Sequence, residues 1–178
     1  MRILVPILLL ALSTAACVRA PEPESEPAPP RPIPRPVPQA TPAPPPGSSD
    51  WRDWPITPGM WSMRDDARGS IALFGAPGAD AALTIRCDTG ARAIYLSRAG
   101  DARATSLAIR TSTTARTLTA QPTGATPAYV AARLAPDDRL LDAIGFSRGR
   151  FVVEAPPLAT LVVPANPEIL RVVEDCRG

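Results

Sequence analysis

The pattern of apolar and polar positions divides the chain into three parts. Residues 3–12 are apolar apart from Pro6, and residues 21–46 read PEPESEPAPPRPIPRPVPQATPAPPP. From Trp51 onward, short apolar stretches are separated by glycine, proline and aspartate. We therefore expect a leader over residues 1–16, a linker over 17–50 and one globular domain over 51–178. A domain of that length is large enough to bury a hydrophobic core.

Most of the domain alternates at the period of a β-strand. Leu83, Ile85 and Cys87 alternate with polar neighbours, so one face of this strand is buried and the other meets water. The expected strands are Gly59–Arg64, Gly69–Phe74, Ala81–Cys87, Arg92–Arg98, Ser106–Thr111, Ala115–Gln121, Ala128–Leu134, Arg150–Ala155 and Leu158–Val163. Short strands separated by turn residues favour antiparallel pairing, so we predict a mainly β fold, an antiparallel β-sandwich or barrel.

Two segments instead follow the helical period. A short internal helix is expected to start at Pro136-Asp137-Asp138 and to end at Gly145, because proline and acids suit a helix N-terminus. A C-terminal helix is expected after the cap residue Asn166, with Pro167 in its first position. Its apolar stripe at the i, i+3, i+4, i+7 spacing consists of Ile169, Val172, Val173 and Cys176.

The composition excludes several kinds of chemistry. All 19 basic residues are arginine, and the chain has no histidine. Histidine-based triads, cysteine–histidine pairs, serine–lysine dyads and lysine Schiff bases are therefore absent. We expect no catalytic residue, no cofactor and no metal site. The net charge of +2 gives no reason to expect a nucleic acid partner, and we expect a monomer.

The N-terminal part reads as an export signal. The apolar run is about ten residues, whereas crossing a bilayer takes about twenty. With Ala15, Ala16 and Cys17, the segment resembles a bacterial lipoprotein signal, although Thr14 stands where that family usually has leucine. The resemblance implies that Cys17 becomes the acylated N-terminus, and Val18 after it suggests the outer membrane. Ordinary cleavage after Ala16 is the alternative, and it would leave a soluble periplasmic protein.

The proline-rich run reads as a spacer. It favours extended polyproline II, and at about 3.1 Å per residue, residues 18–50 could hold the domain up to roughly 100 Å from the lipid. The alternative is that this run is itself a ligand for a groove.

The two remaining cysteines are expected to pair. Cys87 falls on the buried face of its strand and Cys176 on the apolar stripe of its helix. Because an exported chain meets an oxidising compartment, we predict a Cys87–Cys176 disulfide. With these residues, the segments Trp61-Ser62-Met63 and Leu83–Cys87 resemble small periplasmic β-sandwich proteins of the VasI-like and invasion-associated locus B types. The resemblance implies the fold and assigns no functional residue.

Several side chains are candidate ligand contacts. Trp51 and Trp54 could stack on sugars or peptides, or could instead pack under the sheet. Arg148 and Arg150 lie in a predicted turn and could clamp a carboxylate. A further set of arginines could share outward strand faces and bind an anionic polymer or lipid headgroup, or simply be solvated: Arg86, Arg92, Arg98, Arg110, Arg116 and Arg133.

The sequence favours a non-enzymatic binding or adaptor domain of the bacterial cell envelope. The lipid would anchor it in the outer membrane facing the periplasm, with an envelope protein or the cell wall as its partner. The first alternative is an inhibitor of a hydrolase such as lysozyme. The second is a hydrolase that works with carboxylates alone, which needs two acids to converge from the set Asp88, Asp101, Asp142 and Glu154.

Overall fold

The structure of the protein is a computed structural model that describes residues 50–100 and 103–178. The expected signal sequence, the lipid on Cys17 and the linker up to Ser49 lie outside the described residues. No helix in the described ranges has both the length and the apolar character needed to cross a membrane.

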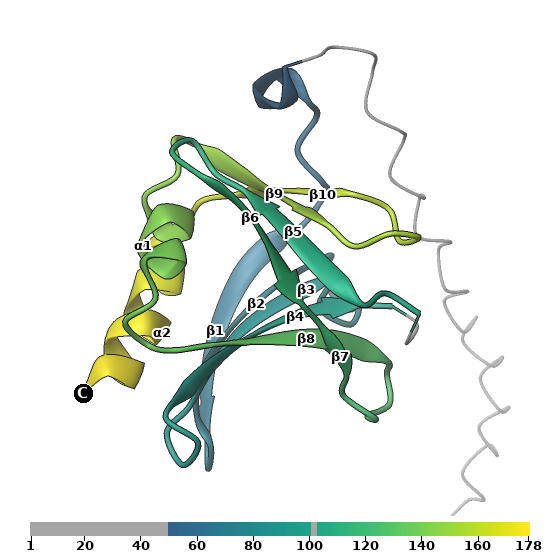
Figure 1. The fold of residues 1–178 in the computed structure, drawn as a ribbon. Coiled ribbons are helices and arrows are strands. Elements are labelled where there is room, and N and C mark those ends of the chain that lie inside the picture. The colour runs from purple at the N-terminus through teal and green to yellow at the C-terminus, as the bar shows by residue number, and fades with distance from the viewer. Residues whose placement is uncertain (1–49, 101–102) are drawn as a thin grey trace, which may run out of the picture. The chain divides into compact units, whose positions relative to one another are not determined.

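Two antiparallel sheets dominate the secondary structure of the described residues. The first sheet has the order β1–β2–β3–β4–β8–β7, with β1 Met60–Asp66, β2 Gly69–Gly75, β3 Leu83–Asp88, β4 Ala93–Ala99, β7 Gln121–Pro122 and β8 Tyr129–Leu134. The second sheet has the order β10–β9–β5–β6, with β5 Ser106–Arg110, β6 Ala115–Thr119, β9 Arg150–Glu154 and β10 Leu161–Pro164. The sheets face each other as a sandwich (Figure 1), so the predicted mainly β fold is confirmed.

The core fills the space between the sheets. Inward positions of β3 and β4 are fully buried, as the alternation predicts. The largest fully buried side chains are Phe74, Phe151, Leu83, Ile85, Ile94, Leu96, Leu107, Ile109, Leu141, Ile144, Leu161 and Ile169. Burying each contributes about 1.5–3 kcal/mol relative to an exposed side chain.

The predicted strand over residues 115–121 is wrong in one respect, because it is divided between the two sheets. β6 pairs with β5 in the second sheet, whereas β7 pairs with β8 in the first. Between them, Ala120 is buried and its N–H donates to the Thr105 carbonyl at 2.9 Å. A small residue at this position lets the chain bend across the core from one sheet to the other.

Both predicted helices form, and α2 has the expected cap. Helix α1 spans Arg139–Gly145, and its N-cap Asp138 accepts the Leu140 N–H. Helix α2 spans Pro167–Arg177, and its N-cap Asn166 accepts the Glu168 N–H. The predicted start of α1 at Pro136 is too early, because the Asp138 N–H donates to the Ala135 carbonyl in a turn before the helix.

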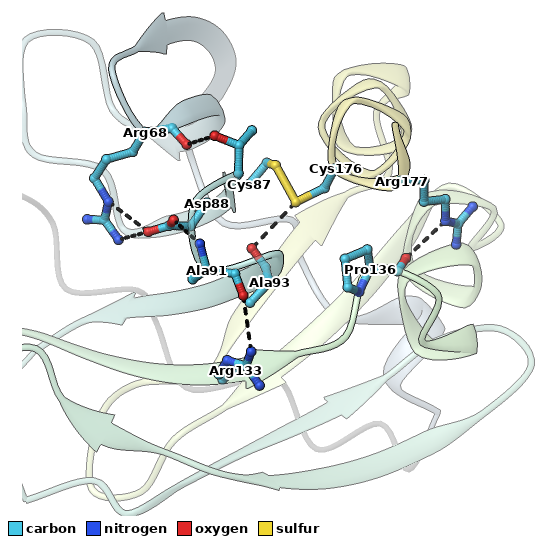
Figure 2. The surroundings of a disulfide bond; sticks show 10 residues. Arg68, Cys87, Asp88, Ala91, Ala93, Arg133, Pro136, Cys176 and Arg177 are labelled. Atoms are coloured by element: carbon cyan, nitrogen blue, oxygen red, sulfur yellow. Dashed lines mark hydrogen bonds and ion pairs between the residues drawn. A yellow bond between two sulfur atoms is a disulfide. The ribbon is translucent and has the colours of Figure 1, made fainter.

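A disulfide fastens α2 to the first sheet. Figure 2 shows the bond between Cys87 of β3 and Cys176 of α2, whose Cα atoms lie 5.3 Å apart. That spacing is within the usual range for disulfides. Cys87 is fully buried and Cys176 half-buried, so the predicted pair is present and lies where the two periodic patterns place it.

Replacing both cysteines, Cys87→Ala with Cys176→Ala, should destabilise the domain strongly. The bond spans 89 residues, and the loop-entropy model then gives about 4–5 kcal/mol of lost unfolding free energy. Urea denaturation of the purified protein measures the loss. Cys17→Ser is the matched control and should leave the midpoint unchanged. A double variant as stable as the parent would show that the crosslink contributes nothing.

Candidate functional site

The two tryptophans at the domain entry are placed against the second sheet. Trp51 lies in a 3-10 turn, η1 (Trp51–Asp53), and its side chain is only 7% exposed. It packs on Val152 and Val162, with Trp54 partly buried beside it. Because Trp51 is covered, it holds the entering chain on the outer face of the second sheet and does not offer a free ring to a ligand.

The two arginines of the predicted turn have different surroundings. Arg150 donates from Nη1 to the Trp54 carbonyl at 2.6 Å, so its guanidinium ties the entry segment to β9. Arg148 is exposed. Its backbone N–H donates to Ser112 Oγ at 3.2 Å, and its side chain makes no hydrogen bond or ion pair with a described residue. Of this pair, Arg148 is the one a partner can reach.

The six strand arginines do not share one outward face. Arg86 and Arg133 do share the outer face of the first sheet, because both pair across strands with Tyr95. Arg110 lies on the outer face of the second sheet, where it is paired with Val152. Arg92 occupies the turn before β4 with φ 46°.

The outward position expected for Arg98 is wrong, because its side chain points inward. It is 9% exposed and donates to the carbonyls of Ala82 and Ala159, at 3.3 and 3.2 Å. Burial lowers the pKa of its guanidinium, since desolvation disfavours the charged form. Its Nε has no hydrogen-bond partner. This arginine links the first sheet to the loop between β9 and β10.

A hollow between α1 and the start of β6 is the best candidate site. Its volume is about 270 Å³, and we call it the α1–β6 hollow. It is lined by Thr113, Thr114, Arg116, Arg139, Leu140 and Ala143. The threonines come from the β5–β6 turn and the last three residues from α1, so a strand end and a helix form its two walls. Figure 1 shows the ribbon of these two elements.

Asp138 joins the two walls. Besides capping α1, its carboxylate accepts a hydrogen bond from Arg116 Nη2 of β6 at 2.7 Å. This bond is the main reason why the pKa of Asp138 lies below its usual range, and the bond from the Leu140 N–H adds to it. Arg139, in contrast, is exposed and makes no hydrogen bond or ion pair with any described residue.

Hydrogen bonds hold the loop after α1 in place beside the β5–β6 turn, and we call this loop the rim of the hollow. Ser147 is 5% exposed; its Oγ donates to the Arg150 carbonyl and accepts the Ser112 N–H at 3.0 Å. These bonds fasten the loop to the β5–β6 turn. Next to this buried serine, Phe146 is 69% exposed. A large apolar ring is therefore presented to water by a backbone that is held in place.

Sequence reasoning singled out Arg116 in the hollow and Arg148 in the loop after α1, but it missed other residues of this site. The missed residues are Thr113, Thr114, Arg139, Ala143 and Phe146. One signal was available: Arg139, Ala143 and Phe146 follow the i, i+4, i+7 spacing of one helix face. This face is not the buried stripe of α1, and Phe146 on it is exposed to water.

The carboxylates considered for a hydrolase lie on separate elements. Asp88 ends β3, Asp142 lies in α1 and Glu154 ends β9, so these three acids do not converge. Each of the first two is paired with an arginine, Arg68 and Arg177 respectively. Asp101 lies outside the described residues. Across the described ranges, no three His, Cys, Asp or Glu side chains are grouped so that they could hold a metal ion.

Comparisons with known proteins return no match: no protein-family model, curated protein or solved structure is similar to this chain.

The Asp138–Arg116 contact should give the domain a pH-dependent stability. The folded pKa of Asp138 is lowered, so its contribution is complete above the unfolded value of about 4 and is lost as the pH falls below it. Asp138→Asn keeps a capping oxygen but removes the charge. We expect the variant to be less stable than the parent at pH 7, with the difference shrinking toward zero below about pH 4.

Urea denaturation at pH 7, 4 and 2.5 measures this difference. Asp137→Asn is the matched control, because Asp137 makes no ion pair with a described residue. A gap between Asp138→Asn and the parent that stays constant across the three pH values would contradict the assignment.

Proposed function

We propose that this protein is a non-enzymatic, lipid-anchored binding or adaptor domain of the bacterial cell envelope, and that it contacts its partner through the α1–β6 hollow and its rim. The observation that carries the proposal is the 69% exposed Phe146 on a loop held by Ser147. A braced loop loses little conformational entropy on binding, so an apolar side chain on it is favourable for association.

The chemistry around the hollow also supports a binding role. Its lining combines apolar carbon from Leu140 and Ala143 with threonine hydroxyls and the guanidinium of Arg139. Ligand sites typically have an apolar surface with a few polar groups that fix orientation. Arginine and aromatic side chains are also enriched among the residues that dominate protein interfaces.

The proposed location rests on the N-terminal residues. The lipoprotein-like run ending at Cys17 and the proline-rich spacer after it would place the domain in the periplasm, tethered to the outer membrane. A soluble periplasmic form produced by cleavage after Ala16 is the alternative location.

Metabolic labelling with a palmitate analogue tests the anchor. The native chain should take up the label and fractionate with the outer membrane, because two or more acyl chains hold a protein stably in a bilayer. Cys17→Ser should remove the label and release the protein. Cys87→Ala with Cys176→Ala, which removes both other thiols, is the control for thiol-directed labelling elsewhere and should keep the label. An unlabelled native chain in the soluble periplasm would favour the alternative location.

Photocrosslinking in living bacteria tests the binding role. A photoreactive amino acid at Ala143 or Phe146 should give a discrete adduct with an envelope component, because both positions lie at the proposed contact surface. The same amino acid at Ala79, an exposed turn residue between β2 and β3, should give none. Identical products from all three positions, or no adduct from any, would contradict the proposal.

The exposed loop also favours the second candidate function, an inhibitor of a hydrolase such as lysozyme. A rigid loop with Phe146 and the exposed Arg148 at its tip has the form that enters an enzyme cleft. The identity of the adduct separates the two functions. A resident envelope component supports the adaptor, whereas a secreted hydrolase supports the inhibitor.

A further inference from the structure

The two sheets have four edge strands, and three of them are protected against pairing with another chain. The edge of β10 is covered by the entry segment, since the Thr57 N–H donates to the Val162 carbonyl and Thr57 Oγ1 accepts the Val162 N–H, both at 2.9 Å. β7 has two residues, and one is Pro122. β1 ends in the charged run Arg64-Asp65-Asp66. Covering, shortening and charging an edge are the usual protections.

The fourth edge, β6, has none of these protections. It reads Ala-Arg-Thr-Leu-Thr, and its one charged residue, Arg116, is already paired with Asp138. Ala115, Thr117 and Thr119 are all exposed. Threonine favours the extended conformation, so the strand is a suitable template for another.

The alternation of hydrogen bonds along the β5–β6 ladder shows which backbone groups of β6 have no partner in β5. The Thr111 N–H donates to the Thr114 carbonyl, and the Ala120 N–H donates to the Thr105 carbonyl. In an antiparallel ladder the bonded pairs alternate, so Arg116 and Leu118 also face β5. The N–H and C=O groups of Ala115, Thr117 and Thr119 therefore point away from the second sheet. No strand among the described residues pairs with them.

Two arginines lie on the elements next to this edge. They are Arg110, whose partner across the ladder is Ala115, and Arg139, on the wall of the hollow. Neither makes an ion pair with a described residue. Arg116 is neutralised by Asp138. An occupant that carries carboxylates would meet both unpaired arginines.

We propose that β6 is a strand-addition site, at which an extended, acidic peptide segment of a partner protein pairs with Ala115, Thr117 and Thr119. Main-chain hydrogen bonds supply the attachment, as in other strand-addition complexes. Side chains of the added segment alternate between the two faces of the sheet. One face carries Arg110, and the other leads toward the α1–β6 hollow and Arg139. This inference rests on the proposed binding function and gives the chemical class of its partner.

A library of random ten-residue peptides displayed on phage is a suitable probe, selected against the full chain purified in detergent. We expect the selected peptides to be enriched in aspartate or glutamate. Replacing the carboxylates of a synthetic binder by amides should weaken it several-fold, as should Arg139→Gln in the protein. Arg171→Gln, which removes an exposed arginine of α2, is the matched control and should have no effect.

The backbone test uses Thr117. Thr117→Pro removes an outward N–H but no bond to β5, and we expect binding to weaken by at least about tenfold. Thr117→Val keeps the N–H and the branched shape, so it should bind as the parent does. In the peptide, alternate residues direct their N–H groups toward β6. N-methylation of that set of residues should abolish binding, whereas N-methylation of the residues between them should preserve it. The peptide methylation experiment leaves the protein unchanged, so it tests backbone pairing at β6 even if Thr117→Pro does not fold.

Three outcomes would overturn the inference. The first is a selection that yields no binder, and the second is binding that survives Thr117→Pro and both methylation patterns. The third is a dimer of the full chain that Thr117→Pro dissociates, because the occupant would then be a second copy. If these occur while the probe at Ala143 still captures an envelope component in cells, strand addition is wrong and the binding function stands. If that probe also captures nothing, the binding function fails as well.

Discussion

The attachment of the C-terminal helix to β3 is the constraint on which this end of the molecule depends. The Cys87–Cys176 bond holds α2 on the first sheet, and α2 in turn positions α1. Arg177 of α2 donates to the Asp142 carboxylate and the Pro136 carbonyl, both at 2.9 Å. A helix of seven residues has little stability alone, so contacts of this kind fix where it lies. One wall of the α1–β6 hollow is therefore positioned by a disulfide that does not line it.

The rim of the hollow differs from an ordinary surface loop because its backbone is held by hydrogen bonds while its large side chains are exposed. Two serines hold the backbone: Ser147, which is buried, and Ser112, which accepts the Arg148 N–H. The side chains beside them, Phe146 and Arg148, remain exposed. Hydrogen bonding through short hydroxyls thus rigidifies the main chain and leaves the large side chains available. This arrangement favours binding, because the loop is already ordered in the folded protein and loses little further conformational entropy when a partner associates.

Much of the fold follows from local patterns, and the site does not. Alternation located the strands, and the start signals over residues 136–138 and at Asn166 located the helices, because both kinds of signal depend on neighbouring residues. The same alternation should have placed Arg98 inward, since it shares the parity of the buried Ile94 and Leu96. Its charge suggested an outward position, but carbonyl groups can solvate a guanidinium inside a protein. The hollow brings together segments far apart in the chain, and no local pattern encodes that.

The entry segment and the proposed contact edge, β6, lie at opposite edges of the second sheet. The entry segment packs Trp51 on the outer face of the second sheet and pairs Thr57 with β10. In the order β10–β9–β5–β6, that segment occupies one edge, and β6 is the opposite edge. A chain that enters along β10 therefore protects an edge that would otherwise pair nonspecifically, and it does not compete for β6. The entry segment thus closes one edge of the second sheet and leaves free the edge proposed for strand addition.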